Sequence, residues 1–396
     1  MPLLAPADGV PPVVSDARGL AAVAADLAVG HGPVAIDAER ASGYRYSQRA
    51  YLVQIRREPV GTVLIDPVMI PQPEFAALAD ALRGLEWVLH AASQDLPCLA
   101  ELGLVPDRLF DTELAGRLAG FERVGLAAMV ERMLGYQLRK GHGAADWSTR
   151  PLPHDWLTYA ALDVELLLPL RDTLFVELTQ QGKLEWAEQE FEAVRRAPAP
   201  APRAEPWRRT SGIHRIRRAR QLAAVRELWE ARDELAERRD IAPGRVLPDA
   251  AIVEAAVADP PDVAELTKLP VYRGRAQRRL AQTWSDALAR ARALPRTALP
   301  EVNPASDGPP PPSRWADKDP AAAARLSAAR TGLAELAARH SLPVENLLQP
   351  DLVRRICWQP PEGATPDSVD RALTAGGARP WQRELTVDLL TKALTG

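Results

Sequence analysis

Two proline-rich segments constrain this 396-residue chain most strongly, because they divide it into three parts. Residues 196–207 contain alternating proline and alanine, and residues 295–316 contain Gly308 followed by four consecutive prolines. Such sequence favours extended, semi-rigid linkers rather than a packed core. A chain of this length can supply two or three separate hydrophobic cores. We therefore expect three folded units, at residues 1–195, 208–294 and 317–396.

The first unit has the pattern of an α/β domain with a mixed sheet. Short apolar runs, which predict buried strands, alternate with helical periodicity before residue 110. Beyond that point the chain is mostly helical, and a polar loop at residues 135–153 precedes a helix that begins near His154. The two later units show helical periodicity, which predicts two small all-α helical bundles. The predicted strands are residues 34–36, 51–56, 62–65, 87–90 and 108–110.

One predicted strand carries a pair of carboxylates at its end. The apolar run 34–36 leads directly into Asp37-x-Glu39. Side chains alternate faces along a strand, so Asp37 and Glu39 point the same way. Two adjacent carboxylates repel each other unless a cation lies between them. The pattern therefore indicates half of a metal site, although an isolated Asp-x-Glu pair is also typical of a strand that ends in a solvated loop.

Two further carboxylates complete the predicted site. Asp95 falls in the first turn after the strand at 87–90, where Ser93 is a suitable N-cap for the following helix. Tyr159 and Asp163 are four residues apart on the last predicted helix of that region, so they project from one face. Four converging carboxylates require neutralisation, which two divalent cations would supply. Oxygen ligands alone favour Mg²⁺ or Mn²⁺ over zinc, and a pair of such cations promotes cleavage of a phosphodiester.

A second Asp-x-Glu pair, Asp111-Thr112-Glu113, is interpreted differently. It lies directly before an apolar helical stretch, where an Asp or Thr side chain caps the first turn. We therefore predict that Asp111 has a capping role and binds no metal.

Three motifs in this order resemble the 3′–5′ exonucleases of the DEDDy branch, and the ribonuclease D family in particular. The resemblance covers about residues 30–195 and includes the sequence that flanks each motif. The motifs are Asp37-x-Glu39, His90-x4-Asp95 and Tyr159-x3-Asp163, and the flanking matches are Tyr51-Leu-Val-Gln-Ile, Leu134-Gly-Tyr-Gln-Leu-Arg-Lys140 and Asp146-Trp147-Ser-Thr-Arg150-Pro-Leu.

The resemblance implies a ribonuclease-H-like (DnaQ-like) fold and an enzyme that hydrolyses RNA from its 3′ end to release 5′-mononucleotides. The implied substrates are tRNA precursors or other structured RNA. It also implies two bound Mg²⁺ or Mn²⁺ ions and a water molecule that Tyr159 orients for attack. The implied metal ligands are Asp37, Glu39, Asp95 and Asp163.

The second unit resembles an HRDC domain, and the third looks like a diverged copy of the second. Glu234-Leu-Ala recurs as Glu335-Leu-Ala at an offset of 101 residues, and Val246-Leu247 recurs as Leu347-Leu348 at the same offset. Two copies of one helical unit explain both matches. The HRDC resemblance rests on Pro243-x2-Val246-Leu247-x-Asp249 and Leu266-Thr-Lys-Leu269-Pro270. We therefore expect an HRDC domain at 208–294 and an HRDC-like domain at 317–396.

Charge is distributed unevenly along the chain. Residues 1–197 have a net charge of −9, whereas residues 208–294 have a net charge of +6. A basic unit beside an acidic unit suggests a polyanionic partner, which the exonuclease motifs indicate to be RNA. HRDC domains can also bind DNA, so single-stranded DNA is a second partner to consider.

The composition excludes several classes of protein. No long uncharged apolar run predicts a membrane span, and the prolines near the N-terminus argue against a signal helix. The two cysteines, Cys98 and Cys357, form neither a disulfide framework nor a zinc cluster. We expect a cytoplasmic protein that has no membrane partner.

Four further residues are weaker predictions for substrate contact. Lys140 and Arg150 lie in the polar loop before the helix of Tyr159, where basic side chains can hold phosphate. His90 ends one predicted strand and Gln54 lies within another, and for both a purely structural role is an equally good interpretation.

Two other functions stay open on the sequence. The same carboxylates would serve a 3′–5′ DNA exonuclease, although the flanks that resemble ribonuclease D favour RNA. A non-catalytic nucleic-acid-binding protein with a relic nuclease fold would lack at least one metal ligand, and all four are present.

Overall fold

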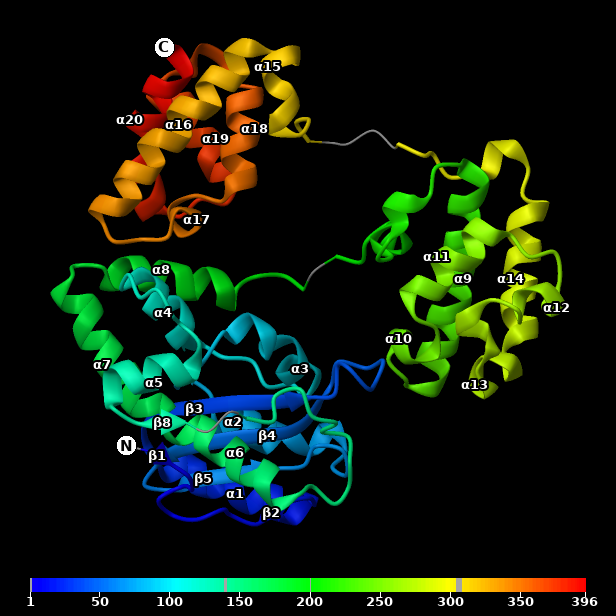
Figure 1. Cartoon of the computed structure of the whole chain (residues 1–396). Helices are drawn as coiled ribbons and strands as arrows, with labels where there is room; N and C mark the ends of the chain where they lie inside the picture. Colours follow the sequence, from blue (N-terminus) through cyan, green and yellow to red (C-terminus); the bar gives the residue numbers. More distant parts are fainter. Residues whose placement is uncertain (1, 139–140, 200, 304–307) are drawn as a thin grey trace.

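The first unit is built around a mixed sheet, as the sequence predicts. The sheet has six strands, one more than predicted, because residues 13–14 form an additional edge strand. The computed structural model describes residues 2–138, 141–199, 201–303 and 308–396. The strands are β2 Val13–Val14, β3 His31–Arg40, β4 Ala50–Glu58, β5 Gly61–Ile65, β6 Glu86–Leu89 and β7 Arg108–Asp111. They lie in the order β2-β5-β4-β3-β6-β7, with β4 antiparallel to both neighbours and the other pairs parallel (Figure 1). A separate parallel pair consists of β1 Pro2–Leu3 and β8 Gln137–Leu138.

The long strand β3 carries the first carboxylate pair through the middle of the sheet. It pairs with β4 so that Asp37 lies opposite Gln54 and Glu39 lies opposite Leu52. The apolar residues 34–36 are fully buried. Side chains alternate along the strand, so Asp37 and Glu39, two residues apart, point to the same face of the sheet.

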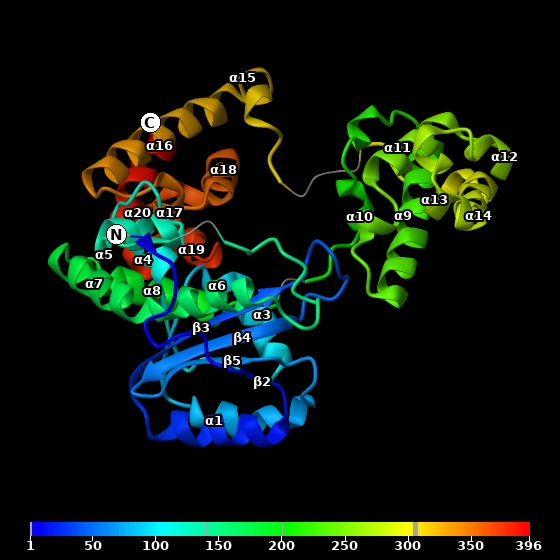
Figure 2. The same cartoon turned by 60° about the horizontal axis from the view of Figure 1, so that its bottom comes forward.

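Helices cover both faces of this sheet (Figure 2). On one face, α1 Ala17–Val29 packs against α2 Ala76–Ala81. On the opposite face, α6 His154–Glu165 lies across β3, β4 and β5, and α7 Leu167–Gln180 follows it. The predicted helix start near His154 is confirmed.

Asp111 caps a helix, as the sequence predicts. Its carboxylate accepts hydrogen bonds from the backbone N–H groups of Glu113 and Leu114 in the first turn of α4 Thr112–Leu118. The helical stretch continues as α5 Leu126–Leu134, which ends at the predicted residue.

The segment that carries Asp95 is held differently from the prediction. The carboxylate of Asp111 also accepts hydrogen bonds from the backbone N–H groups of residues 91 and 92, at 3.1 and 2.9 Å. Asp95 then directly precedes α3 Leu96–Glu101. The predicted cap at Ser93 is wrong, because Ser93 lies inside the short turn 92–94 and the residue that precedes α3 is Asp95.

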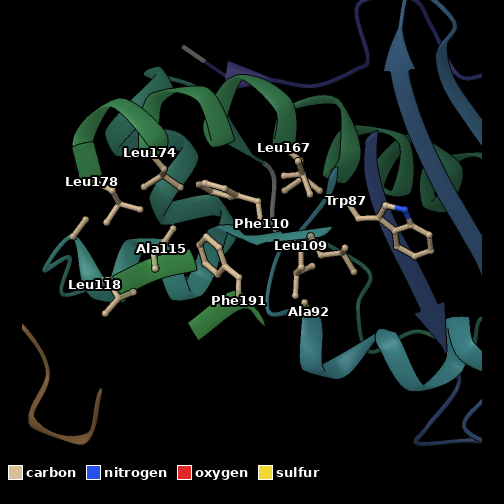
Figure 3. Packing of buried hydrophobic residues seen from close by; sticks show 14 of the residues in the cluster. Trp87, Ala92, Leu109, Phe110, Ala115, Leu118, Leu167, Leu174, Leu178 and Phe191 are labelled. Carbon is tan, nitrogen blue, oxygen red and sulfur yellow. The ribbon is translucent and has the colours of Figure 1, made fainter. Parts of the chain in front are cut away.

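One large hydrophobic core extends from the sheet through α8 Leu184–Arg195 into the C-terminal unit. Figure 3 shows the part of this core where β7 is covered by α4, α7 and α8. The rings of Phe110 on β7 and Phe191 on α8 lie there with 4.8 Å between their centroids. The C-terminal unit therefore packs on the first unit through apolar side chains that both share.

The contact between α8 and the C-terminal unit also has a polar part. Trp186 on α8 stacks on Trp381, with 4.9 Å between the ring centroids. The indole N–H of Trp381 donates to the carboxylate of Glu190 at 3.1 Å, and Arg379 forms an ion pair with the same carboxylate at 3.1 Å. These contacts fix the C-terminal unit on α8.

The offset of 101 residues found in the sequence recurs in the positions of the helices. In the middle unit, α9, α10 and α11 begin 101 residues before α16, α17 and α18 of the C-terminal unit. The middle unit has a hydrophobic core of its own. Its helices are α9 Ala219–Arg239, α10 Pro243–Val246, α11 Asp249–Ala258, α12 Val263–Leu266, α13 Arg275–Arg279 and α14 Ala281–Ala293. Those of the C-terminal unit are α15 Trp315–Lys318, α16 Pro320–Arg339, α17 Val344–Leu347, α18 Pro350–Trp358, α19 Pro366–Ala375 and α20 Pro380–Thr395.

Two predictions from composition concern membranes and thiols. Within the described part of the chain, no helix combines the length and the apolar character that a membrane crossing requires. Cys98 and Cys357 are both buried and both free.

Candidate metal centre

A pocket of about 490 Å³ lies where β3, the end of β6 and α6 meet. It brings together all four predicted carboxylates and Tyr159. Strand β3 contributes Asp37 and Glu39, the residue before α3 is Asp95, and α6 contributes Tyr159 and Asp163. Elements far apart in the sequence therefore supply one concave, acid-lined surface.

Three of the carboxylates are spaced to share one cation. One oxygen from each of Asp37, Glu39 and Asp163 lies within 4.8 Å of the others. A hard cation whose oxygen ligands lie at about 2.0 to 2.5 Å fits among oxygens with this spacing. Asp95 lines the same pocket, and its negative charge acts on Glu39. The residues present therefore fit a centre for divalent cations.

Burial disfavours the ionised form of these carboxyl groups when no cation is bound. It is the main cause that raises the pKa of Asp37, Glu39, Asp95 and Asp163 above their ordinary values. The negative charges of Asp37, Asp163 and Asp95 raise the pKa of Glu39 further. A bound divalent cation reverses this effect, because it favours the ionised form of every carboxylate around it.

Without divalent cations, the stability of the protein should fall as the pH rises above the ordinary carboxyl range. Between the ordinary pKa of an aspartic acid, 3.8, and its raised value, the folded state holds more protons than the unfolded state. Unfolding then becomes more favourable with increasing pH. We expect the Tm in EDTA to fall less steeply with pH in Asp163→Asn than in the wild type, and to be higher at neutral pH.

Thermal unfolding across a pH series, with EDTA or with Mg²⁺, measures this difference. Mg²⁺ should raise the Tm of the wild type more than that of Asp163→Asn. A variant that is less stable than the wild type in EDTA at neutral pH would contradict the electrostatic account.

Arg40 is a cation in the acidic pocket that the sequence analysis did not identify. Its guanidinium lies 3.7 Å from Oδ1 of Asp95. The register of β3 shifts between Glu39 and Arg40, so both consecutive residues line the pocket. Regular alternation would place them on opposite faces, and no local sequence signal marks such an irregularity.

Tyr159 is held in the pocket as a neutral hydroxyl. Burial, followed by the negative charges of Asp163 and Glu39, raises the pKa of Tyr159 far above the physiological range. The hydroxyl also lies close to Asp163, one turn further along α6. Gly141 packs so closely that a Cβ atom there would lie 1.7 Å from Cε2 of the ring. Gly141 thus helps to position Tyr159. The sequence did not indicate this role, because glycine is common in polar loops such as residues 135–153.

His90 lines the pocket as a neutral imidazole. Burial lowers the pKa of His90 to about 4. The hydroxyl of Thr112 donates to the Leu89 carbonyl at 3.1 Å, and its oxygen lies 2.9 Å from Nδ1 of His90. The imidazole is therefore oriented by Thr112, and the contact of His90 with substrate stays a prediction.

Of the other residues predicted to contact substrate, the structure brings neither Arg150 nor Gln54 to the pocket. Nε and Nη2 of Arg150 donate to the two carboxylate oxygens of Asp66 at 2.6 and 2.8 Å, and further donations go to backbone carbonyls. The donors of Arg150 therefore hold its loop to the sheet, and its contact with substrate phosphate stays a prediction. Gln54 is completely buried beside Asp37. Lys140 lies outside the described residues.

Comparison with known proteins shows which family has this organisation. Residues 11–179 match the family model described as 3′-5′ exonuclease, residues 221–288 match the HRDC domain, and residues 308–394 match the 3′ to 5′ exonuclease C-terminal domain. Ribonuclease D of Gluconacetobacter diazotrophicus is 34% identical over 286 residues, which cover 70% of this chain and 71% of that protein. The chain belongs to the ribonuclease D family.

Three other proteins match over nearly the whole chain. Ribonuclease D of Nitrobacter hamburgensis is 28% identical over 384 residues, which cover 94% of this chain and 92% of that protein. The crystal structure of Escherichia coli ribonuclease D aligns with a TM-score of 0.70 and 26% identity, over 97% of this chain and 98% of that one. A protein from Bifidobacterium adolescentis aligns with a TM-score of 0.91 and 37% identity, over 100% and 99%.

As a member of the ribonuclease D family, the protein is a hydrolase that acts on RNA as a 3′–5′ exoribonuclease. The exonuclease fold implies dependence on a divalent metal, and the acidic cluster supplies the oxygen donors that such a metal requires. The resemblance of the middle unit to an HRDC domain is confirmed by its family model. The C-terminal unit matches the exonuclease C-terminal domain, while its likeness to HRDC rests on the shared offset of 101 residues.

Proposed function

We propose that this member of the ribonuclease D family binds two Mg²⁺ or Mn²⁺ ions and removes 5′-mononucleotides from RNA 3′ ends. The proposed ligands are Asp37, Glu39, Asp95 and Asp163. The observation that carries the proposal is the approach of three carboxylate oxygens to within 4.8 Å of one another. Bound cations would lower the pKa of the attacking water and neutralise charge on the scissile phosphate.

In this proposal Tyr159 orients the attacking water. Its raised pKa keeps the hydroxyl protonated, so the side chain acts as a hydrogen-bonding group and not as a base. Gly141 and α6 fix the ring in place, and the hydroxyl lies beside Asp163. A water held by this hydroxyl would meet the phosphorus in a defined direction, which reduces the entropy that the reaction must lose.

We infer that the natural substrates are structured RNAs such as tRNA precursors. The Escherichia coli ribonuclease D is described as an exoribonuclease involved in structured RNA processing. In the present chain, Arg275, Arg278 and Arg279 are exposed on α13 of the basic middle unit. Each such arginine can contact a phosphate and release a counterion. Single-stranded DNA carries the same phosphates, so it is the competing substrate in the experiment that follows.

A circular RNA should survive under conditions in which a linear RNA of the same sequence is degraded. The proposed reaction needs a free 3′ end, because the pocket accepts the terminal linkage. A linear RNA labelled at its 5′ end should give a ladder of products shortened from the 3′ end, together with 5′-mononucleotides. Gel electrophoresis and chromatography of the products in Mg²⁺ or Mn²⁺ measure both results.

Two controls make this experiment decisive. A linear DNA of the same sequence reports whether the enzyme requires RNA, and equal rates on both would support the DNA exonuclease alternative. Rapid cleavage within the circle would show an endonuclease and would contradict the proposal.

A further inference from the structure

One loop links the carboxylate pocket to the middle unit. Residues 41–49 join β3, which carries Asp37 and Glu39, to β4. The first part of the loop, Ser42 and Gly43, lines the pocket. The following residues reach the middle unit, and both views show the connection from β3 to β4 extending towards α10 (Figures 1 and 2).

The middle unit holds the backbone of this loop at the wall of the pocket. Nε of Arg245 on α10 donates to the carbonyl of Gly43 at 2.7 Å. The guanidinium carbon of Arg245 lies 4.0 Å from the centroid of the Tyr44 ring. The backbone N–H of Ala242 donates to the carbonyl of Tyr44 at 2.9 Å. Gly43 therefore lines the pocket and is bonded to the middle unit at the same time.

A second group of contacts holds the far side of the loop. Asp240, at the C-terminal end of α9, accepts from the backbone N–H of Ser47 at 2.9 Å and from the hydroxyl of Tyr51 at 3.4 Å. The hydroxyl of Tyr46 donates to Asp233 at 3.1 Å, and the Tyr46 side chain packs against the core of the middle unit. The middle unit therefore holds the loop at two places, through residues 43 and 44 and again through residues 46 and 47.

The first unit also holds this loop, because Ala41 and Tyr44 pack in a hydrophobic cluster of that unit. Arg45 donates to the hydroxyl of Ser148 at 2.8 Å, and Ser42 donates to Gln48 within the loop at 2.8 Å. Fixing one conformation of a loop in advance removes an entropic cost from the reaction. The contacts from the middle unit supply this restraint next to the carboxylates.

We propose that the middle unit acts on catalysis by positioning the loop that forms one wall of the metal pocket. Arg245 is a positioning residue that acts through Gly43, and Asp233 and Asp240 are positioning residues that act through residues 46 and 47. This inference rests on the proposed function, because it concerns the same pocket. It adds a role that is independent of RNA length, whereas phosphate binding by exposed arginines affects only RNA that is long enough to reach them.

Substrate length separates these two roles in the full-length protein. Arg245→Ala should lower kcat/KM about tenfold on the shortest RNA that the wild type degrades, and by a similar factor on a long RNA. Arg245→Lys should recover part of the activity, because an ammonium group can donate to the Gly43 carbonyl but cannot stack on Tyr44. Tyr46→Phe, which keeps the ring and removes the hydrogen bond to Asp233, should give a smaller loss in the same direction.

Arg371→Ala is the matched control. It removes the same charge from an exposed position on α19, outside the basic middle unit. We expect this variant to match the wild type on both the short and the long RNA. The Tm of each variant should match that of the wild type, since Arg245 and Arg371 are both exposed.

Three results would overturn the inference, and they are distinguishable. Wild-type activity of Arg245→Ala on the short RNA would show that the loop contact does not affect the reaction. A loss on long RNA alone, with a shallower salt dependence, would assign Arg245 to phosphate binding. A wild-type protein that releases no 5′-mononucleotides from any RNA would overturn the proposed function itself.

Discussion

Asp37→Asn should lower the rate of hydrolysis about a thousandfold or more while the fold stays intact. The substitution keeps the size of the side chain and removes the charge on which cation binding depends. Asp37 belongs to the group of three carboxylates whose oxygens lie within 4.8 Å of one another. Burial already favours its protonated form without metal, so a neutral amide should not destabilise the metal-free protein. The measurement is the rate of 5′-mononucleotide release at saturating Mg²⁺.

Asp172→Asn is a matched control for this change. Asp172 lies on α7 with its side chain 70% exposed, so the same chemical change there should leave the rate at the wild-type value. An Asp37→Asn protein that hydrolyses RNA at the wild-type rate would contradict the assignment of Asp37 as a metal ligand.

Tyr159→Phe should lower kcat about a hundredfold and leave the Kd for RNA nearly unchanged. Phenylalanine keeps the ring that packs against Gly141 and removes the hydroxyl that is proposed to hold the attacking water. Because this interaction acts on water during the reaction, its loss should affect turnover more than binding. Single-turnover kinetics in Mg²⁺ give the rate, and fluorescence anisotropy in EDTA gives the Kd.

Tyr136→Phe provides the comparison for this prediction. Tyr136 is half-buried outside the pocket lining, so loss of its hydroxyl should leave kcat unchanged. If kcat of Tyr159→Phe also matched the wild type, Tyr159 would have a packing role only.

Local patterns in the sequence were sufficient to place most of the candidate site. Asp37 and Glu39 share a face because strand residues alternate, and Tyr159 and Asp163 share a face because they are one helical turn apart. The mixed sheet was also predicted from local patterns, because short apolar runs alternate with helical periodicity along the first unit. Asp95 was included because it falls in the first turn after a predicted strand, although an acidic residue in a first helical turn also has many structural explanations.

Features that depend on contacts between distant residues could not be predicted in this way. Arg150 was interpreted as a phosphate contact, because no pattern in the neighbouring sequence indicates its ion pair with Asp66, which lies 84 residues away. The contact between Gly43 and Arg245 joins residues that are 202 apart. Arg40 reaches the pocket through a local shift in register, which depends on how β3 pairs with β4.

Metal add-back tests the proposed centre without changing the protein. Full-length protein is treated with EDTA, and release of 5′-mononucleotides from linear RNA is followed as Mg²⁺ or Mn²⁺ is restored. We predict no release in EDTA, full recovery with either metal, and recovery of Asp163→Asn only at much higher metal concentration, since that variant lacks one buried ligand. Sustained release of 5′-mononucleotides in EDTA, or the same metal dependence in Asp163→Asn as in the wild type, would contradict the assignment.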